Sequence, residues 1–358
     1  MKTIKRIAAL LLVTVMALTV VGCHKKDEIA VTIGDVEFTS AYYMCALINA
    51  EMEAQNLVYE KLTDEEKKAE EIDYYSKKVE DKEYVTWVED RAIENLKKIA
   101  SYKILCKEAK IELEDSVLTS AKQYTEYYWN NYGYGAYYEP NGVSSATYEK
   151  YTIDSYYSEK YFEHLYGKGG DKEIKAEDVK TKIYDNFVIA DILNASYAEN
   201  ADDNSKAALK ARMENYAKEL NSGKKTYEQV YNEYNNVTKT DTTTTTTDEK
   251  QPKDKYAQVI GSADTNYASE YYDTVKGMKV GEAVVKETSA GDGLYILFKQ
   301  DIKADDYYLD TLDNDARHLI ADEDYEKFIE DYAKKLEADV NKFAVKQFKV
   351  KKIVKPEQ

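Results

Sequence analysis

The sequence predicts an α+β protein, with a mostly helical region followed by a smaller region of mixed strands and helices. The first observation is an apolar stripe at helical spacing that recurs in segments between residues 40 and 165. The second is a change of pattern at Phe187–Leu193, which reads FVIADIL and is followed by further strand-like runs. This order of strands and helices fits a small domain built on an antiparallel or mixed sheet.

The N-terminus has the layout of a secretory signal peptide. Basic residues within Met1–Arg6 precede an apolar run that covers residues 7–21. A transmembrane anchor is the alternative interpretation, but the run is shorter than the ~20 residues that a spanning helix usually needs. We therefore expect residues 1–22 to be a signal peptide.

The end of this apolar run resembles the lipobox of bacterial lipoproteins. Val20, Val21 and Gly22 lead directly to Cys23. In such lipoproteins the small residue before the cysteine admits the signal peptidase, and the cysteine thiol receives diacylglycerol. The resemblance implies that Cys23 is lipidated and that residues 23–29 tether the chain to the outer face of the cell membrane.

The charge balance argues against a nucleic-acid partner. The chain has 358 residues, with 50 Lys and Arg against 67 Asp and Glu, and a formal net charge of −17. Removal of residues 1–22 takes away three basic side chains and no acidic one, so the mature chain would carry −20. Nucleic-acid binding needs clusters of Lys and Arg on the surface. The length suits about two domains.

The cysteines and histidines offer no metal site. Besides Cys23 there are only Cys45 and Cys106, which could form a disulfide in an oxidising compartment, although two buried free thiols are the simpler interpretation. Three scattered histidines and two distant cysteines lack metal-ligand spacing, and there is no Gly-rich phosphate loop. We expect no metal and no cofactor.

The first half of the mature chain is expected to be a hairpin followed by helices. Ala30–Ile33 and Val36–Phe38 alternate around Gly34-Asp35, which is typical of a two-residue β-hairpin. Thr39 or Ser40 then caps a helix. The further segments that we expect are a charged helix or loop over 63–76, helices over about 83–110, 115–131 and 144–165, a Gly/Tyr loop at 132–142 and a stop at 167–170.

In the second half, Phe187–Leu193 is a buried strand, and a helix capped by Asn204 or Ser205 ends at Ser222-Gly223. The Thr-rich residues 238–250 are a flexible loop. The other expected elements are a short helix at 227–234, a strand at 256–260, a short helix at 267–275, strands at 283–287 and 294–299, helix over 305–340 and a final strand-like run at 343–353.

The order of these elements resembles that of the PrsA and SurA class of membrane-anchored extracytoplasmic foldases, over nearly the whole mature chain. Val31–Thr39 looks like the opening hairpin and helix cap of this class. Tyr227–Tyr234 looks like the parvulin helix that follows a Gly-containing turn. Met278–Glu282 is similar to the turn before the last strand pair, and Gly293–Phe298 is similar to the closing strand.

The resemblance implies an α+β fold in which a SurA-like helical chaperone module is closed by both chain ends. A small peptidyl-prolyl isomerase domain of the parvulin (PpiC) type, with the order β-α3-β-α-β2, would be inserted in it. The implied domains are the chaperone module at 30–170, the parvulin-like domain at 185–301 with its Thr-rich insertion, and a helix and strand at 305–358 that return to the module.

The expected isomerase site departs from the parvulin pattern. Active parvulins carry a His-Ile-Leu-like motif on the first strand and a second histidine on the closing strand, where this chain has Asp191 and Tyr295. The proline pocket is kept in part, since Tyr271 matches its aromatic position and Tyr267 and Ile260 lie near the others. A buried aspartate resists burial unless it is protonated or paired, for instance by a neighbouring hydroxyl. We expect weak or absent catalysis.

Tyrosine is abundant, with 35 tyrosines against seven phenylalanines. A tyrosine ring is apolar and its tip is polar, so it can be exposed and still bind apolar surface. The densest cluster is a candidate surface for unfolded exported polypeptides, although half of it could simply pack the helical module. Its members are Tyr124, Tyr127, Tyr128, Trp129, Tyr132, Tyr134, Tyr137 and Tyr138.

These features predict a lipid-anchored extracytoplasmic chaperone or foldase whose parvulin-like domain is weak or inactive. An active peptidyl-prolyl isomerase and a non-catalytic surface-binding lipoprotein are the alternatives. The sequence leaves open whether the chain forms a homodimer.

Overall fold

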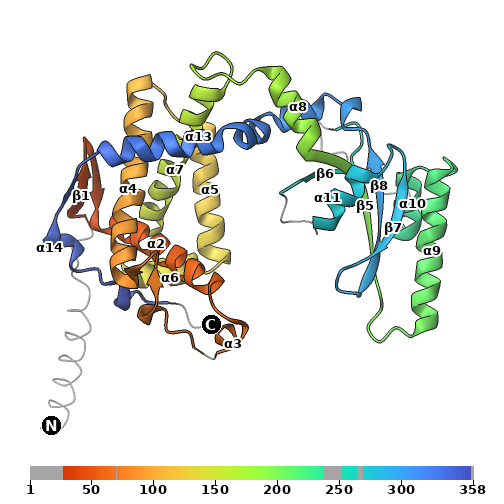
Figure 1. Ribbon diagram of the computed structural model, residues 1–358, viewed down its shortest axis with the longest axis horizontal. Coiled ribbons are helices and arrows are strands. Elements are labelled where there is room, and N and C mark those ends of the chain that lie inside the picture. The colour runs from red at the N-terminus through yellow and green to blue at the C-terminus, as the bar shows by residue number, and fades with distance from the viewer. Residues whose placement is uncertain (1–26, 70, 238–251, 264–268, 356–358) are drawn as a thin grey trace, which may run out of the picture. The chain divides into compact units, whose positions relative to one another are not determined.

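The structure is a computed structural model that describes residues 27–69, 71–237, 252–263 and 269–355. The chain has an α+β fold and divides into two compact units (Figure 1). Unit 1 contains the residues up to 173 and from 323 onward, and unit 2 contains residues 174–322. Unit 2 is therefore an insertion between two stretches of unit 1. The predictions for residues 1–22, Cys23, Tyr267 and the Thr-rich loop at 238–250 lie outside the described residues.

A three-stranded antiparallel sheet joins the two ends of the chain in unit 1. Its order is β2-β1-β9, formed by β1 (Ile29–Ile33), β2 (Val36–Thr39) and β9 (Ala338–Val340). The first two strands confirm the predicted hairpin, and Gly34 in its turn has a φ of +59°, which glycine adopts without steric cost. Because β1 pairs on both sides, the last strand of the chain completes the sheet that the first strand begins.

Side chains cap two helices of unit 1 at their N-termini, and Thr39 is one of the two caps that the sequence predicts for the first of them. Thr39 caps α2 (Ser40–Glu60) and Ser144 caps α7 (Ser145–Tyr166), each by accepting a hydrogen bond from a backbone N–H three residues later. The remaining elements of unit 1 are α3 (Asp64–Lys67), η2 (Tyr74–Ser76), β3 (Lys78–Val79), β4 (Lys82–Glu83), α4 (Tyr84–Ala109), α5 (Asp115–Asn131), α6 (Tyr134–Tyr138), η3 (Glu139–Asn141), α14 (Lys342–Val345) and η5 (Val350–Lys352).

Tyrosines fill part of the core of unit 1 with their hydroxyls bonded. Tyr42 is 2% exposed, and its hydroxyl donates to Oδ2 of Asp154 at 3.0 Å. Lys103 Nζ lies 2.7 Å from the other carboxylate oxygen of Asp154. These two contacts offset the cost of burying the Asp154 carboxylate.

The two cysteines of the described chain are buried free thiols, which was one of the two alternatives from the sequence. Burial raises the pKa of both, that of Cys106 to about 11. Neither thiol is therefore a ready nucleophile at neutral pH.

Polar contacts fix the C-terminal segment to unit 1. Glu51 on α2 is fully buried, and Lys355 Nζ lies 2.9 Å from its Oε1. The side chain of Asn141 donates to the carbonyl of Val354 at 2.8 Å and accepts from its N–H at 2.9 Å. Asn141, in the sequence Pro140-Asn141-Gly142, thus holds the end of the chain in place.

Three local predictions in unit 1 are wrong. The expected strand at 343–353 is instead α14 and η5, because Oδ1 of Asn341 accepts from the N–H groups of Phe343 and Ala344 and starts a helical turn. The strand β9 lies inside the expected helix at 305–340. The expected loop at 132–142 is mostly helical, because Tyr134 and Tyr138 lie on one face of α6 and pack on α7.

Unit 2 is built on a four-stranded antiparallel sheet of order β6-β5-β8-β7. The strands are β5 (Phe187–Ser196), β6 (Ala257–Gly261), β7 (Ala283–Glu287) and β8 (Gly293–Gln300). One face of the sheet packs against α9 (Asp203–Asn221) and α10 (Tyr227–Tyr234), and the other packs against α11 (Ser269–Gly277). Among the described residues, two helices lie between β5 and β6, whereas the parvulin order β-α3-β-α-β2 has three.

Side-chain caps set the ends of these helices. Asp202, rather than the predicted Asn204 or Ser205, caps α9 by accepting from the N–H of Ser205 at 2.7 Å. Thr226 and Gln229 form a capping box at the start of α10. The apolar side chains of α9 that are buried against the sheet are Met213, Tyr216, Ala217 and Leu220.

Residues 305–322 belong to unit 2, whereas the resemblance to the foldases implies that 305–358 return to the first module. The segment comprises η4 (Ile302–Ala304), α12 (Tyr307–Thr311) and the start of α13 (Asp313–Lys335), and it packs with α8 (Ala176–Asn186) against β5. The buried residues of this cluster are Val179, Ile183, Ile189, Tyr308, Leu312 and Ala316. An apolar stripe that continues from α12 into α13 holds this segment to the sheet.

Candidate functional site

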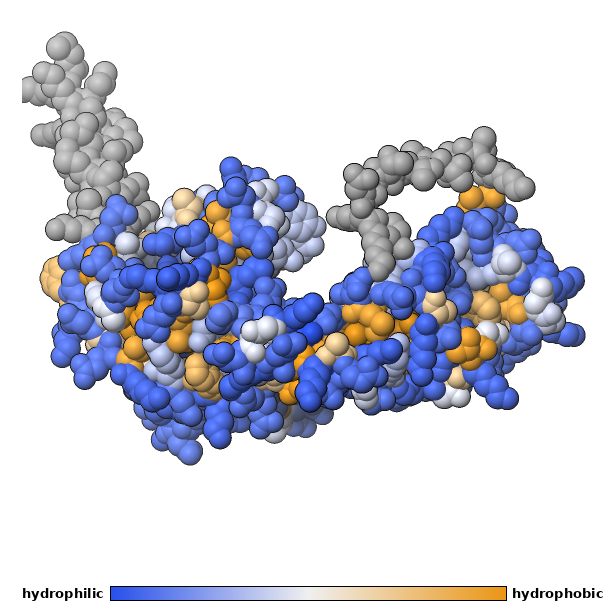
Figure 2. Space-filling view, turned by 90° about the horizontal axis from the view of Figure 1, so that it is seen from above, coloured by the Kyte–Doolittle hydropathy of each residue, from blue (hydrophilic) through white to orange (hydrophobic). Residues whose placement is uncertain are grey.

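An aromatic surface covers the junction of α5 and α6 in unit 1. Tyr124, Tyr127 and Tyr132 are 41, 52 and 59% exposed, which is high for side chains of this size. Hydrophilic residues predominate on the face drawn in Figure 2, with hydrophobic residues in smaller groups between them. A group of exposed rings on a charged protein of this kind is a candidate contact surface. We call these three residues, with Tyr128, the tyrosine surface.

Tyr128 is the centre of the tyrosine surface. It is half-buried, and the centroid of its ring lies 4.2 Å from that of Tyr124, 5.5 Å from that of Tyr127 and 4.9 Å from that of Tyr132. Such ring pairs are each worth about 0.5–1.5 kcal/mol beyond the area they bury. The exposed rings are thus held against a common support before any ligand arrives.

The rest of the predicted cluster packs inward. Trp129, Tyr134 and Tyr138 surround Tyr148 of α7, with centroid distances of 5.9, 5.6 and 4.8 Å. Tyr138 is 2% exposed, and Trp129, Tyr134 and Tyr137 are half-buried. The cluster therefore divides into rings that pack the helical module and rings that stay exposed.

The tyrosine surface carries phenol hydroxyls as well as apolar rings. Tyr127 and Tyr132 share a hydrogen bond of 3.4 Å between their hydroxyl oxygens, and this bond raises the pKa of Tyr127. A neutral phenol can donate to a peptide carbonyl and accept from a peptide N–H. The surface thus presents both apolar ring faces and hydrogen-bonding hydroxyls.

Asp191 is buried at the centre of unit 2. It lies on β5 between β6 and β8 and is 0% exposed. Its Oδ2 accepts from Nε2 of Gln300 at 2.6 Å, and Nε2 also donates to Oδ2 of Asp254 at 3.3 Å. Among the described residues, its Oδ1 has no hydrogen-bond partner. The expectation that a hydroxyl satisfies Asp191 is wrong, because the partner is an amide.

The surroundings of Asp191 favour its neutral form. Burial raises the pKa of Asp191 to about 7, the hydrogen bond from Gln300 opposes this rise, and the nearby Asp254 adds to it. The sequence alone missed Gln300 and Asp254. Gln300 lies diagonally across from Asp191 on β8, a neighbour that the strand register would have revealed.

The structure separates the two candidate catalytic residues. Asp191 pairs with Phe298, and Tyr295 pairs with Asn194. Side chains alternate between the faces of a sheet, so Asp191 lies on the face of α9 and α10 while Tyr295 lies on the face of α11. Asp191 and Tyr295 therefore cannot act together on one substrate atom.

The described residues of the expected proline pocket do come together with Tyr295. Ile260 and Tyr295 are each 1% exposed and share a cluster with Tyr271, whose ring centroid lies 4.3 Å from that of Tyr295. A proline ring would have to displace Tyr271 from this contact. The arrangement is that of a packed core rather than an open slot.

Within the described ranges, no group of histidine, cysteine and carboxylate side chains could hold a metal ion. None of the helices described is both long and apolar enough to span a membrane.

The sequence matches no protein-family model and no curated protein. Among solved structures, the chain is similar to the crystal structure of the foldase protein PrsA from Streptococcus pneumoniae, at 15% identity and a TM-score of 0.37, covering 68% of this chain and 82% of that one. PrsA from Lactococcus lactis is 14% identical, with a TM-score of 0.40, and the match covers 88% of this chain and 96% of that one. PrsA from Bacillus subtilis is 14% identical, with a TM-score of 0.35, and the match covers 74% of this chain and 91% of that one.

The solved structures that this chain resembles are PrsA foldases. The likeness is distant, so the chemistry of the site has to come from the residues of this chain.

Proposed function

We propose that this chain is a lipid-anchored chaperone on the outer face of the cell membrane that holds unfolded exported polypeptides on its tyrosine surface. Its parvulin-like unit 2 would have weak isomerase activity or none. The observation that carries the proposal is the set of three exposed rings packed around Tyr128. The signal-like N-terminus and Cys23 support the location.

Exposed rings on a rigid support suit the binding of unfolded chains. An unfolded polypeptide exposes apolar side chains together with unpaired backbone groups, and tyrosine can contact both. Because the rings are already ordered by Tyr128, binding costs little side-chain entropy. The tyrosine surface therefore fits clients of varied sequence.

The arrangement of unit 2 argues against efficient prolyl isomerisation. A catalyst has to lower a barrier of about 18–20 kcal/mol by binding the twisted amide better than the planar one. That requires an apolar slot with polar groups on the same side. Here Asp191 lies on the opposite face from Tyr271, and Tyr271 packs against Tyr295.

The chaperone role is tested by aggregation of a client. Mature protein carrying Cys23→Ser is mixed with chemically denatured rhodanese, and light scattering is followed after dilution. The triple variant Tyr124→Ser, Tyr127→Ser and Tyr132→Ser is expected to lose most of the suppression. A matched control replaces three other exposed residues by serine, namely Met52, Tyr59 and Leu319.

Equal suppression by the tyrosine variant and its control would contradict the tyrosine surface as the client site. Absence of suppression by the parent protein would contradict the chaperone role itself. Circular dichroism of each variant shows that a lost effect is not lost folding.

The isomerase expectation has a separate assay. We expect no acceleration of cis–trans exchange in a short X-Pro peptide by the mature protein. If exchange were accelerated and Tyr271→Ala removed the effect, the pocket would be a working site and unit 2 an active isomerase.

A further inference from the structure

Positive charge is concentrated at the C-terminal end of this acidic chain. Residues 340–355 contain six lysines and no aspartate or glutamate. The chain as a whole has a net charge of −17, so the remainder carries −23. Such a separation of charge within one chain indicates a local partner of negative charge.

The lysines of this segment, which we call the lysine segment, face solvent. Ala344, Phe348, Val350 and Ile353 are buried in the core of unit 1 and fix the backbone. All six lysines are exposed. Within the described part of the chain only Lys355 forms an ion pair, with Glu51. The other five are Lys342, Lys346, Lys349, Lys351 and Lys352.

An apolar side chain projects from the same segment. Phe343 is 75% exposed, the largest value for any large hydrophobic residue among those described. Water-exposed phenylalanine is unfavourable by roughly 1.5–3 kcal/mol relative to a buried one. Lysines around an exposed aromatic ring are the combination that binds the interface of an anionic lipid bilayer.

The lysine segment lies next to the start of the mature chain. Asn341 donates its backbone N–H to the carbonyl of Ala30 at 2.9 Å and its side-chain amide to the carbonyl of Ile29 at 3.2 Å. Cys23 is six residues before Ile29. Six residues span at most about 22 Å in any conformation, so a lipid on Cys23 would keep the segment close to the bilayer.

We infer that the lysine segment and Phe343 form a second membrane contact, which binds anionic lipid headgroups while the phenylalanine enters the interface. The inference rests on the proposed lipid anchoring of Cys23 for its role in the cell. A diacylglycerol on Cys23 would hold the chain at the bilayer without fixing which face of unit 1 meets it. Lysines near an anionic surface add about 1 kcal/mol each, so the lysine segment would favour one orientation.

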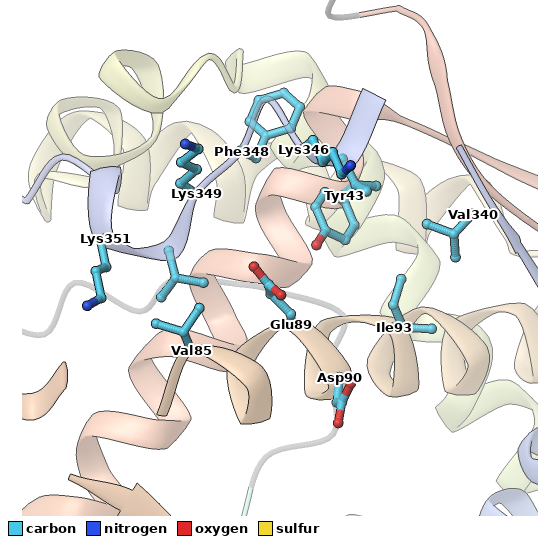
Figure 3. A pocket seen from close by; sticks show the side chains of 12 residues that line it. Tyr43, Val85, Glu89, Asp90, Ile93, Val340, Lys346, Phe348, Lys349 and Lys351 are labelled. Carbon is cyan, nitrogen blue, oxygen red and sulfur yellow. The ribbon is translucent and has the colours of Figure 1, made fainter. Parts of the chain in front are cut away.

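Two acidic residues lie beside three lysines of the lysine segment and affect how strongly it would bind an anion. Lys346, Lys349 and Lys351 line a cavity of about 460 Å³ together with Glu89 and Asp90 (Figure 3). Asp90 forms an ion pair with Lys82 at 2.8 Å. Glu89 forms no ion pair with a described residue, so it opposes an incoming phosphate. Replacing Glu89 by glutamine should therefore strengthen binding to anionic vesicles.

The test is co-sedimentation of mature Cys23→Ser protein with vesicles of equal parts phosphatidylglycerol and phosphatidylcholine. Vesicles of phosphatidylcholine alone are the reference. Lysines at an anionic surface contribute roughly fivefold each, so the triple variant Lys346→Gln, Lys349→Gln and Lys352→Gln is expected to bind at least about tenfold more weakly. Phe343→Ala is expected to bind several-fold more weakly, and high salt to abolish binding.

A matched control removes the same charge elsewhere, by changing the exposed Lys61, Lys210 and Lys218 to glutamine. Equal binding to the two vesicle types, or equal weakening in the control, would overturn the inference. Polyglutamate that competes as well as vesicles, with no effect of Phe343→Ala, would point to an acidic polymer and would also overturn it.

Lipidation of Cys23 is tested separately, by measuring the incorporation of labelled palmitate into the chain that retains this cysteine. Failure there would contradict the anchoring while leaving the vesicle result intact. The two proposals can thus fail independently.

Discussion

A single carboxyl group, that of Asp191, makes the stability of unit 2 depend on pH. Burial raises its pKa from the ordinary 3.8 to about 7. Between these two values the folded chain holds a proton that the unfolded chain has released. Folding is therefore favoured at the acidic end, and stability falls as the pH rises from about 4 to about 7 and is level above that. A shift of this size corresponds to about 4 kcal/mol at most.

Asp191→Asn keeps the shape of the side chain and removes the titration. We expect the variant to be more stable than the parent by roughly 2 kcal/mol at pH 8 and equal to it near pH 4. Urea unfolding followed by far-UV circular dichroism measures this. Asp185→Asn, which changes an exposed carboxyl of the same unit, serves as control. An unchanged pH dependence would show that Asp191 finds a polar partner in solution.

The sequence identified which residues occupy the expected isomerase site, but not which side chains they contact. Alignment with the parvulin pattern found Asp191 and Tyr295 but could not show that they face opposite sides of the sheet, because that depends on the register of β5 with β8. The partner of Asp191 was missed for the same reason. Gln300 is more than one hundred residues away along the chain.

At the scale of the element, the packing of α6 depends on a residue without a side chain. A Cβ placed on Gly135 would lie 2.9 Å from Nε1 of Trp129, which is too close for real contacts. The indole is held by Tyr138 and Tyr148 and cannot move freely. Gly135 thus lets α6 lie against α5 beneath the tyrosine surface.

Gly135→Ala is expected to destabilise unit 1 by about 1 kcal/mol. Overpacking costs about 1–3 kcal/mol, which exceeds the gain of about 1 kcal/mol in helix propensity. The indole should move, and the emission of Trp129 should change in a Trp87→Phe background. Ala136→Gly is the control at the neighbouring exposed position. A more stable variant with unchanged emission would mean that the space is open.

Elements with local signals were predicted well. The hairpin of β1 and β2, the cap at Thr39 and the strand β5 are encoded within a few residues of themselves. The C-terminal end was not, because β9 exists only through its pairing with β1, about three hundred residues earlier. Local alternation in residues 343–353 pointed to a strand, while the cap at Asn341 starts a helix there.

For the whole molecule, unit 1 needs both ends of the chain. The arrangement of an insertion between two stretches was expected from the resemblance, but the return to unit 1 begins at 323 rather than 305. That boundary depends on how α12 packs against β5, which the sequence pattern of one helix does not contain.

A chain that ends after Lys335 is expected to lose the fold of unit 1. It lacks β9 and the buried Phe348, Val350 and Ile353. These three side chains together contribute about 5 kcal/mol, comparable with the total stability of a domain. Trp87 and Trp129 both lie in unit 1, so their fluorescence reports its unfolding separately from unit 2.

The control for this truncation is a chain that ends after Lys355, which retains the described C-terminal contacts. Native fluorescence and an unchanged melting temperature in the shorter chain would show that β9 adds little to unit 1.

The pairing of β1 with β9 also sets an order of events when the protein is made. If the chain crosses a membrane with its N-terminus first, as the proposed function requires, β1 arrives on the far side long before β9. All four strands of unit 2 lie within residues 187–300, so its sheet can close while the end of the chain is still being translocated. The sheet of unit 1 cannot form until β9 is available. Its pairing with β1 then closes a loop of about three hundred residues, which is a slow step. During that interval the protein would itself be an unfolded exported polypeptide, of the kind that it is proposed to bind.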